Sequence, residues 1–552
     1  MSGWARLGVV LAVALGLAIY ATTPPVPLPA SAPPTQFAAA RAMQDVAVIA
    51  ARPHPTGSAE SAAVRAYLTQ RMQALGLTVS VRTAALEPKA VKRIVKWSGD
   101  AKANPPLSSL VGVLSGSDRQ APALLLMAHY DSVWGSPGAA DDATGVASVL
   151  EVVRTLKARG APRRDIIVLL TDGEELGLQG ARAFFAGDPL LPHIGAIINA
   201  ESRGGGGRTG MFQTSHGNGG GVALFAGAVA RPSGNSLSAF IYSVLPNDTD
   251  LSAAMKGPWL GYNFAFIGRP GLYHSPLATP ARLDQGSVQD MGAQVLDLAA
   301  ALDAAPQLPV RAPDVVFFDL FGLFTVHYPA WLGWLMLGGA ALGLGMAARG
   351  EQGVGRGALR MLGLIGAGAL GLTLLVWLGL AGTGANYYDR LAAIPLIEVV
   401  AGGWCLAALL WFLGSAPTGR GAVVGAALPL MVLGLMAQAL APTAAYLLVL
   451  PLALLGLGLT VRPLAPAGAV FTVGTMLALG HMLLQGVGPD FPGAAALPLA
   501  LLAAALMPLW PGLNARAQRL VMVLAVVVAL GSGLWLRTHA FADTAAVYAK
   551  RG

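Results

Sequence analysis

The apolar residues of this chain follow two different patterns. Up to about residue 310, short apolar runs alternate with segments in which apolar residues recur every three or four positions. Short uninterrupted runs are typical of buried strands, and the wider spacing is typical of helices. From residue 328 to 537 the chain is almost continuously Leu, Ala, Gly and Val. The pattern therefore predicts an α/β domain followed by an all-α, multi-pass membrane domain.

The predicted elements of the first domain alternate between strand and helix. Strands are expected at 77–81, 109–114, 123–128, 165–170, 194–199, 239–244 and 262–267. Helices are expected at 39–51, 64–75, 143–158, 177–185, 219–230, 250–256 and 287–304. The basic segment 84–105 is interpreted as an irregular, solvated excursion. Because the strands are long and apolar, the alternation predicts a sheet covered on both faces.

Eight apolar stretches in the second domain are candidates for membrane spans, because each approaches the roughly 20 residues that cross a bilayer. They lie at 328–347, 359–380, 391–413, 421–440, 443–461, 466–485, 493–511 and 518–537. Residues 7–21 form a ninth. We interpret this ninth stretch as an uncleaved anchor rather than a signal peptide, because the sequence AIYA at 18–21 is a poor cleavage site.

Basic residues concentrate in alternate loops of the membrane region. If Arg6 is cytoplasmic, the alternation places these arginines on the same side: Arg349, Arg356, Arg360, Arg420, Arg462, Arg516 and Arg519. The opposite loops hold only Asp389, Arg390 and Asp490 before a mixed C-terminal tail. This asymmetry follows the positive-inside rule. It predicts that residues 22–325 lie outside the cytoplasm, in the periplasm if the protein belongs to a bacterial inner membrane.

The composition supports a membrane protein and excludes several other classes. Of 552 residues, 55% are hydrophobic and 12% are charged, whereas soluble domains carry about 25% charged residues. The net charge is +8, but no basic cluster is interleaved with aromatic residues, so we expect no nucleic-acid partner. Cys405 is the single cysteine, which excludes an intrachain disulfide and a cysteine-based metal site. For Glu398 and His481, polar groups inside spans, helix packing is favoured over transport.

Histidines and carboxylates follow the predicted strands of the first domain. An open α/β sheet gathers its chemistry at the carboxyl ends of its strands, and histidine nitrogen with carboxylate oxygen is the ligand set of zinc in hydrolases. The residues in question are His129, Asp141, Glu174, Glu175, Glu201 and His274. Taken singly, each has a structural explanation, such as a helix N-cap for Asp141. Together they predict a site for two zinc ions joined by a bridging carboxylate.

The motifs around these residues resemble the M28 family of zinc aminopeptidases. They are H-x-D at His129, G-A-x-D-D-A-T-G around Asp141, D-G-E-E-L-G around Glu174, N-A-E ending at Glu201, and Y-H-S around His274. The resemblance covers roughly residues 40–305. It implies a mixed-sheet α/β/α zinc-exopeptidase fold with two Zn²⁺ per chain. The anchor and the eight spans narrow the resemblance to the membrane-bound group of endoplasmic-reticulum metallopeptidase and vacuolar membrane protease.

The resemblance also assigns roles to individual residues. His129 and Glu201 would hold one zinc, Glu175 and His274 the other, with Asp141 bridging. Glu174 would be the general base that activates water, and Asp131 would hydrogen-bond His129 and fix its tautomer. Asp142 would cap or brace its loop. The candidates for the substrate pocket are Asp248, Asp250 and Tyr273.

One segment departs from the family pattern. Relatives often carry H-T-x-x-D-T after the last ligand histidine, whereas this chain reads H-S-P-L-A-T from His274 to Thr279. Ala278 therefore replaces a carboxylate that braces the loop. This departure puts the geometry of the loop in doubt, but not the role of His274.

The domains expected are an anchor (1–21), a Pro-rich linker (22–38), the peptidase-like domain (39–310), a juxtamembrane segment (311–327), the eight-helix domain (328–537) and a tail (538–552).

The function expected is a membrane-bound aminopeptidase acting on peptides, with the lipid bilayer as its other partner. A carboxypeptidase or dipeptidase is the alternative if Arg203 or Arg208 grips a carboxylate. Two further alternatives are a catalytically silent receptor or assembly module and a transporter with an appended peptidase domain. The sequence gives no oligomeric state.

Overall fold

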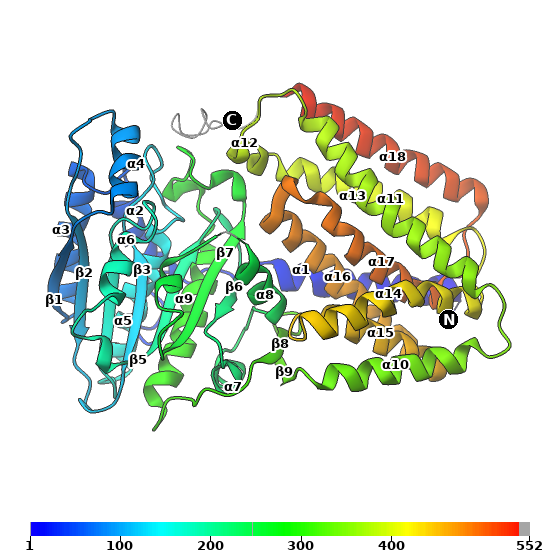
Figure 1. Ribbon diagram of the computed structural model, residues 1–552, viewed down its shortest axis with the longest axis horizontal. Helices are drawn as coiled ribbons and strands as arrows, with labels where there is room; N and C mark the ends of the chain where they lie inside the picture. Colours follow the sequence, from blue (N-terminus) through cyan, green and yellow to red (C-terminus); the bar gives the residue numbers. More distant parts are fainter. Residues whose placement is uncertain (1, 246, 540–552) are drawn as a thin grey trace. The chain divides into compact units, whose positions relative to one another are not determined.

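The computed structural model describes residues 2–245 and 247–539 of the protein. They divide into two compact units, one of residues 23–327 and one of residues 2–22 together with 328–539. The first unit is an α/β fold and the second is helical (Figure 1). The predicted tail at 538–552 falls almost wholly outside the described residues.

The α/β unit is built on a mixed sheet of seven strands in the order β1-β2-β4-β3-β5-β7-β6. The strands are β1 (Thr78–Ala84), β2 (Leu107–Leu114), β3 (Ala123–His129), β4 (Ile166–Thr171), β5 (Ile194–Ser202), β6 (Gly206–Thr214) and β7 (Leu260–Gly268). β4, β3, β5 and β7 run parallel, whereas the pairs β1–β2, β2–β4 and β6–β7 are antiparallel. The mixed sheet expected from the resemblance is confirmed.

Helices cover both faces of this sheet. Along β3, Leu124 and Leu126 pack into one core and Leu125 and Met127 into another, because side chains alternate along a strand. The larger core is covered by α2 (Ala39–Ile49), α3 (Ala59–Ala74), α5 (Ala143–Arg159), α7 (Gly219–Ala228) and α9 (Gln285–Ala304). The smaller is covered by α6 (Gln179–Phe185) and the 3₁₀ turn η2 (Asp250–Ala253). The prediction of a doubly covered sheet is confirmed.

Two sequence predictions of local structure are wrong. Residues 239–244, expected as a strand, belong to α8 (Ser236–Val244), whose first turn is capped by the Asn235 side chain. The excursion at 84–105, expected to be irregular, contains α4 (Pro88–Ser98). Its apolar face, with Ile94 and Trp97, packs on Leu107 and Leu176.

Three further elements were not resolved by the sequence pattern. β6 begins in a glycine-rich stretch and forms one edge of the sheet. The helix expected at 250–256 is shortened to η2. The predicted juxtamembrane segment contains most of a two-stranded hairpin of β8 (Val315–Asp319) and β9 (Thr325–Pro329).

The helical unit has a helix at each of the nine predicted spans. They are α1 (Gly3–Thr22), α10 (Leu332–Ala348), α11 (Val354–Leu380), α13 (Ile394–Leu413), α14 (Arg420–Leu440), α15 (Tyr446–Thr460), α16 (Ala465–Val487), α17 (Ala496–Leu506) and α18 (Ala515–Thr538). By length and composition, seven helical segments of the described chain can cross a membrane; one of them is Pro492–Leu509, which joins α17 to the 3₁₀ turns on either side of it. α10 and α15, with 17 and 15 residues, are shorter, and for these two the span stays a prediction.

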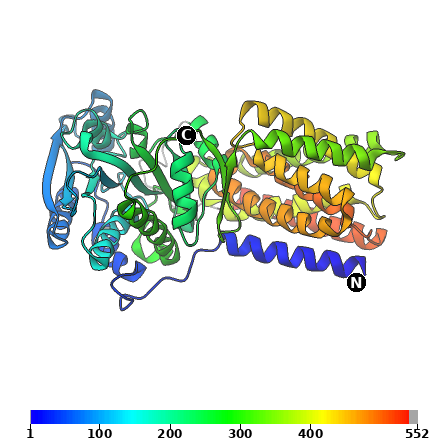
Figure 2. The same ribbon diagram turned by 90° about the horizontal axis from the view of Figure 1, so that it is seen from below.

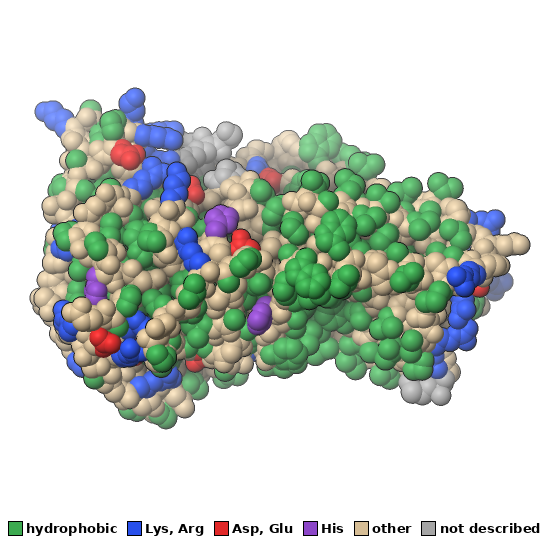
Figure 3. All heavy atoms as spheres, turned by 60° about the horizontal axis from the view of Figure 1, so that its bottom comes forward, with side chains coloured by type: hydrophobic (Ala, Val, Ile, Leu, Met, Phe, Trp, Pro, Cys, Tyr) green, Lys and Arg blue, Asp and Glu red, His purple; other side chains and the backbone are tan. Residues whose placement is uncertain are grey.

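The exterior of this unit is apolar. Leu342, Leu370 and Leu440 each expose more than 70% of their surface, and hydrophobic side chains cover much of the face of the unit that Figure 3 shows. α1 runs alongside the other helices (Figure 2) and packs on α16. Such a surface is stable in lipid and unfavourable in water. The chain is therefore a membrane protein.

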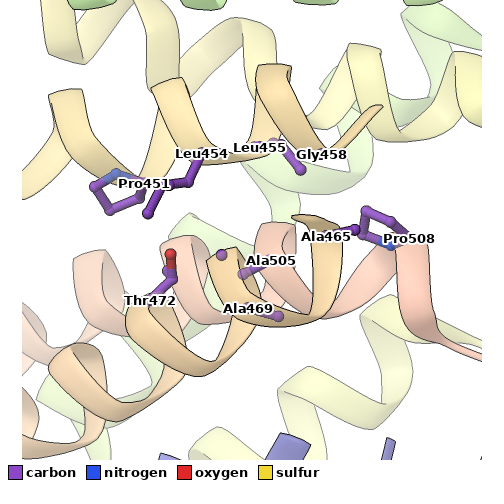
Figure 4. A pocket seen from close by; sticks show the side chains of 10 residues that line it. Pro451, Leu454, Leu455, Gly458, Ala465, Ala469, Thr472, Ala505 and Pro508 are labelled. Atoms are coloured by element: carbon purple, nitrogen blue, oxygen red, sulfur yellow. The ribbon is translucent and has the colours of Figure 1, made fainter. Parts of the chain in front are cut away.

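Polar groups inside the helical unit are few. Glu398 on α13 lies 2.8 Å from Nδ1 of His481 and accepts a hydrogen bond from Gln485, both on α16. This contact joins two helices, as expected for packing. A pocket between α15, α16 and α17 is lined by apolar side chains and the hydroxyl-bearing Thr472 (Figure 4). It holds no titratable group, so the candidate chemistry lies in the α/β unit.

Candidate metal centre

The parallel strands bring the predicted ligands to one edge of the sheet. β3 ends at His129, β5 carries Glu201, and His274 follows β7. Glu174 and Glu175 lie in the turn after β4, and Asp141 lies in the loop between β3 and α5. Because these strands are adjacent and parallel, their carboxyl ends converge.

The five predicted ligands form two clusters that share Asp141. In the first, Nε2 of His129 lies 3.0 Å from Oδ1 of Asp141 and 3.3 Å from Oε1 of Glu201. In the second, Nε2 of His274 lies 3.2 Å from Oδ2 of Asp141 and 3.1 Å from Oε1 of Glu175. Within each cluster the three possible ligand atoms lie within 4.8 Å of one another. Asp141 thus offers one oxygen to each cluster.

His129 is held by its second ring nitrogen. Nδ1 lies 3.0 Å from the backbone carbonyl oxygen of Asp131 and 3.6 Å from its carboxylate. Since a carbonyl oxygen only accepts hydrogen bonds, Nδ1 donates and Nε2 can present its lone pair to the cluster. The backbone of Asp131, rather than its side chain, makes the shorter contact with the imidazole.

The carboxylate of Asp131 also supports the turn after β4. It accepts the backbone N–H of Glu174 at 3.0 Å and that of Glu175 at 3.3 Å. The Thr56 hydroxyl donates to it at 3.3 Å and to Asp172 at 2.8 Å. Asp131 therefore connects the strand of one ligand to the turn that carries two other candidate residues.

Asp142 caps helix α5. Its carboxylate accepts the N–H of Gly145 at 3.0 Å and that of His129 at 3.3 Å. The peptide bond between Asp141 and Asp142 is cis. A Cβ atom on Gly145 would meet the Asp142 carboxylate at 2.4 Å, so glycine is required there.

The loop that carries His274 is held by backbone contacts. His274 has a φ of +53°, in the left-handed region that few non-glycine residues adopt. The Ala278 carbonyl accepts the N–H of Ala139 at 3.0 Å, which ties this loop to the loop of Asp141. A backbone bond thus braces the position at which the family carries a carboxylate.

The three candidates for the substrate pocket differ in their surroundings. The Tyr273 ring stacks on His274, with ring centroids 3.7 Å apart. Asp250 is buried and accepts the Thr171 hydroxyl, whereas Asp248 is exposed. Of the two arginines considered for carboxylate binding, Arg208 is buried in a 2.6 Å salt bridge with Asp290.

Two residues near the centre were missed by the sequence analysis. Tyr242 of α8 packs against Phe212. Burial raises the pKa of its hydroxyl, and the negative charges of Glu201 and Glu174 raise this pKa further. Arg93 of α4 donates to the backbone carbonyl of Glu175 at 2.9 Å. Both lie on elements whose secondary structure was predicted wrongly; the periodic Ala90, Ile94 and Trp97 were the available signal for α4.

The electrostatics of the centre call for added positive charge. Burial raises the pKa of Glu175 to about 7 and that of Glu174 and Glu201 above their usual values, and neighbouring carboxylates add to each rise. Burial lowers the pKa of His129, but the charge of Glu201 and hydrogen bonds to carboxylates raise it well above its usual value. Two histidines and three carboxylates suit divalent zinc, so the residues present fit a pair of such ions.

A sheet with this order and a buried His/carboxylate centre at the carboxyl ends of its strands is an arrangement that suits metal-dependent hydrolysis. Residues 109–299 match the family model described as Peptidase family M28. The chain therefore contains an M28 peptidase domain, as the sequence motifs indicated.

The relatives of this chain include proteins named endoplasmic reticulum metallopeptidase 1 and vacuolar membrane protease. The chain is 33% identical over 235 residues to endoplasmic reticulum metallopeptidase 1 of Mus musculus, covering 41% of this chain and 26% of that protein. It is 29% identical over 296 residues to the vacuolar membrane protease of Lachancea thermotolerans, covering 51% and 30%. The chain thus spans between a quarter and a third of the length of these relatives.

Solved structures of similar fold include an aminopeptidase from Aneurinibacillus, with a TM-score of 0.39 and 15% identity over 51% of this chain and 97% of that one. A glutaminyl cyclase from Porphyromonas gingivalis has a TM-score of 0.38 and 18% identity, covering 48% and 97%.

Proposed function

We propose that this protein is a membrane-bound zinc exopeptidase with two zinc ions, and that it is an aminopeptidase. The observation that carries the proposal is the position of Asp141, whose two carboxylate oxygens face two separate His/carboxylate clusters. A carboxylate in this position can bridge two cations. His129 and Glu201 would hold one ion, and Glu175 and His274 the other.

Zinc bound in these clusters would lower the pKa of a water molecule and polarise the scissile carbonyl. The Glu174 carboxylate accepts the proton of the attacking water and passes it to the leaving amine nitrogen. Burial raises its pKa above the usual value of a carboxyl group, which makes it a stronger proton acceptor. Asp131 holds the backbone of Glu174 and thereby orients this base.

Two alternatives are weakened by what the side chains contact. A carboxypeptidase needs a cation to grip the substrate carboxylate. Arg208 is engaged in a buried pair with Asp290, which leaves Arg203, whose guanidinium lies over the Tyr273 ring, as the one of the two candidates near His274. A silent receptor module does not need a preserved ligand set, yet this chain keeps the five ligands and Glu174 at one edge of the sheet. The aminopeptidase remains the proposal.

The location we propose is a bacterial inner membrane, with the peptidase domain (39–310) on the periplasmic side. The support is the distribution of arginines, which lie in alternate loops of the helical unit. Protease accessibility in sealed vesicles tests this: residues 39–310 should be cleaved only from the periplasmic face.

A paired peptide panel tests the substrate class. We expect the purified full chain with zinc to release the first residue of a peptide with a free amino terminus. Acetylation of that terminus should abolish cleavage, whereas amidation of the carboxyl terminus should not. Cleavage that requires a free carboxyl terminus would show a carboxypeptidase, and cleavage that requires both would show a dipeptidase.

A further inference from the structure

The excursion helix α4 contacts both loops that carry the candidate ligands. Its apolar face forms a cluster with Leu176, the residue after Glu175. Trp134, from the loop between His129 and Asp141, packs against the same cluster. The helix is therefore in a position to fix these two loops relative to each other.

The start of α4 is tied to the helix that follows the Glu174–Glu175 turn. The N–H of Glu87 donates to the Gln179 side chain at 2.9 Å, and the Gln179 amide donates back to the Glu87 carboxylate at 3.3 Å. Since Gln179 is the first residue of α6, this reciprocal pair anchors α4 to the element that ends the turn.

Arg93 makes the direct contact with the turn. Its Nη1 donates to the backbone carbonyl oxygen of Glu175 at 2.9 Å. The guanidinium also lies over the Trp97 ring, 5.7 Å from its centroid, one helical turn further along α4. A hydrogen bond from a charged donor is about twice as strong as one between neutral groups, and the aromatic ring restricts the orientation of the guanidinium.

The backbone of Glu174 and Glu175 is thus held from two sides. Its N–H groups donate to the Asp131 carboxylate, and the Glu175 carbonyl accepts from Arg93. The other carbonyls of the turn are bonded within it: Glu174 accepts from Gly177 and Leu178. An anion on one side and a cation on the other fix the short segment that carries the proposed base and a proposed ligand.

We propose that Arg93 is a positioning residue for the metal centre, acting through the Glu175 carbonyl to orient the carboxylates of Glu174 and Glu175. This proposal rests on the proposed function for its kinetic consequence, but not for its structural one. Arg93 is not one of the candidate ligands and contacts the turn through the Glu175 backbone; in this role it sets where the two carboxylates point. Groups that orient metal ligands from outside typically contribute about 10- to 100-fold in metal affinity or activity.

The test compares three variants of the full chain in detergent. Arg93→Met removes the donor, Arg93→Lys keeps a cation that can donate one hydrogen bond, and Lys92→Met is the matched control on the solvent face of the same helix. For Arg93→Met we expect about 10- to 100-fold weaker zinc binding by chelator competition and a similar loss in kcat. KM should change less than about twofold, because uniform binding of substrate is not affected.

A second measurement needs no turnover. Hydrogen exchange in the metal-free protein should show faster exchange of the Glu174 and Glu175 amides in Arg93→Met, with Arg93→Lys between it and the wild type. Lys92→Met should match the wild type in every measurement. Melting temperatures identify a variant in which α4 no longer folds. If Arg93→Met is such a variant, the zinc affinity and hydrogen exchange of Arg93→Lys, which keeps the helix, test the proposal.

The proposal is overturned if Arg93→Met keeps wild-type zinc affinity and wild-type exchange, or if Lys92→Met loses as much. If no peptide is cleaved even by the wild type, the proposed function fails while zinc binding and exchange still decide the role of Arg93.

Discussion

The carboxylate of Asp131 lies 3.0 Å from the backbone nitrogen of Glu174, closer than the 3.6 Å that separates it from the ring of His129. The sequence resemblance assigned this carboxylate to the imidazole. In the structure the backbone carbonyl of Asp131 lies nearest to the imidazole, at 3.0 Å, with the carboxylate at 3.6 Å, and the same carboxylate also holds the turn. One residue thereby fixes a ligand through its backbone and the proposed base through its side chain.

Replacing Asp131 tests this division. We expect Asp131→Ala to lower kcat and zinc affinity by about 10- to 100-fold, because the Glu174–Glu175 turn loses its acceptor. Asp131→Asn keeps one acceptor oxygen and should lose less. Steady-state kinetics with zinc titration checks both variants. Equal losses in Asn and Ala would show that the charge, rather than an acceptor at this position, is what matters.

Removing one ligand should remove one ion. His274→Ala leaves the cluster of His129, Asp141 and Glu201 intact, so we expect about one zinc per chain instead of two. Asp141→Ala takes a ligand from both clusters and should retain neither ion firmly. Elemental analysis of the purified variants gives these numbers. The bridging role of Asp141 is rejected if its variant still binds as much zinc as His274→Ala.

The pH dependence of the metal-free protein follows from Glu175. Burial raises its folded pKa to about 7, from an ordinary value of 4.5. Between these values the folded state binds more protons than the unfolded state, so the stability contributed by this group falls as pH rises. Zinc supplies the missing positive charge and competes with those protons. The melting temperature should therefore rise more with zinc at pH 8 than at pH 5; an equal rise at both would contradict the account.

Gly145 is a point at which a single methyl group should disturb the centre. A Cβ atom there would lie 2.4 Å from the Asp142 carboxylate and 2.6 Å from the carbonyl of Ala200. Gly145→Ala should cost roughly 2–4 kcal/mol, from a lost helix cap and overpacking. The control is Gly187→Ala, which meets nothing within 4 Å. The melting temperatures of the two variants check this prediction. Equal melting temperatures would contradict it, because they would show that the loop accommodates the methyl group without loss of stability.

The sequence was sufficient wherever the physical signal is local and strong. Residues such as Leu125 and Ile167 lie in long apolar runs, which predicted the buried parallel strands. His129 and Glu201 close such runs, and adjacent parallel strands must bring their ends together. The prediction of a His/carboxylate centre therefore rested on the residues at these strand ends taken together with Asp141, in the loop before α5.

The sequence was insufficient where a neighbour in space decides the structure. The lysines of α4 suggested a solvated loop. The helix is stabilised by the packing of Ile94 and Trp97 on Leu107 and Leu176, and these partners are distant in the sequence. In α8 the aromatic and β-branched residues favour a strand, but the Asn235 cap begins a helix. Tyr242 and Arg93 were missed for this reason, because their positions depend on those two helices.

The most direct test of the central claim measures zinc content and turnover together, in the wild type and in Glu174→Gln. Two zinc ions bound by five converging side chains should be retained in both proteins, since Glu174 is not a ligand. Turnover of an aminoacyl-p-nitroanilide should fall by about 10²- to 10⁴-fold in the variant, the usual contribution of a general base. A wild type that binds no zinc, or a variant with undiminished turnover, would contradict the account.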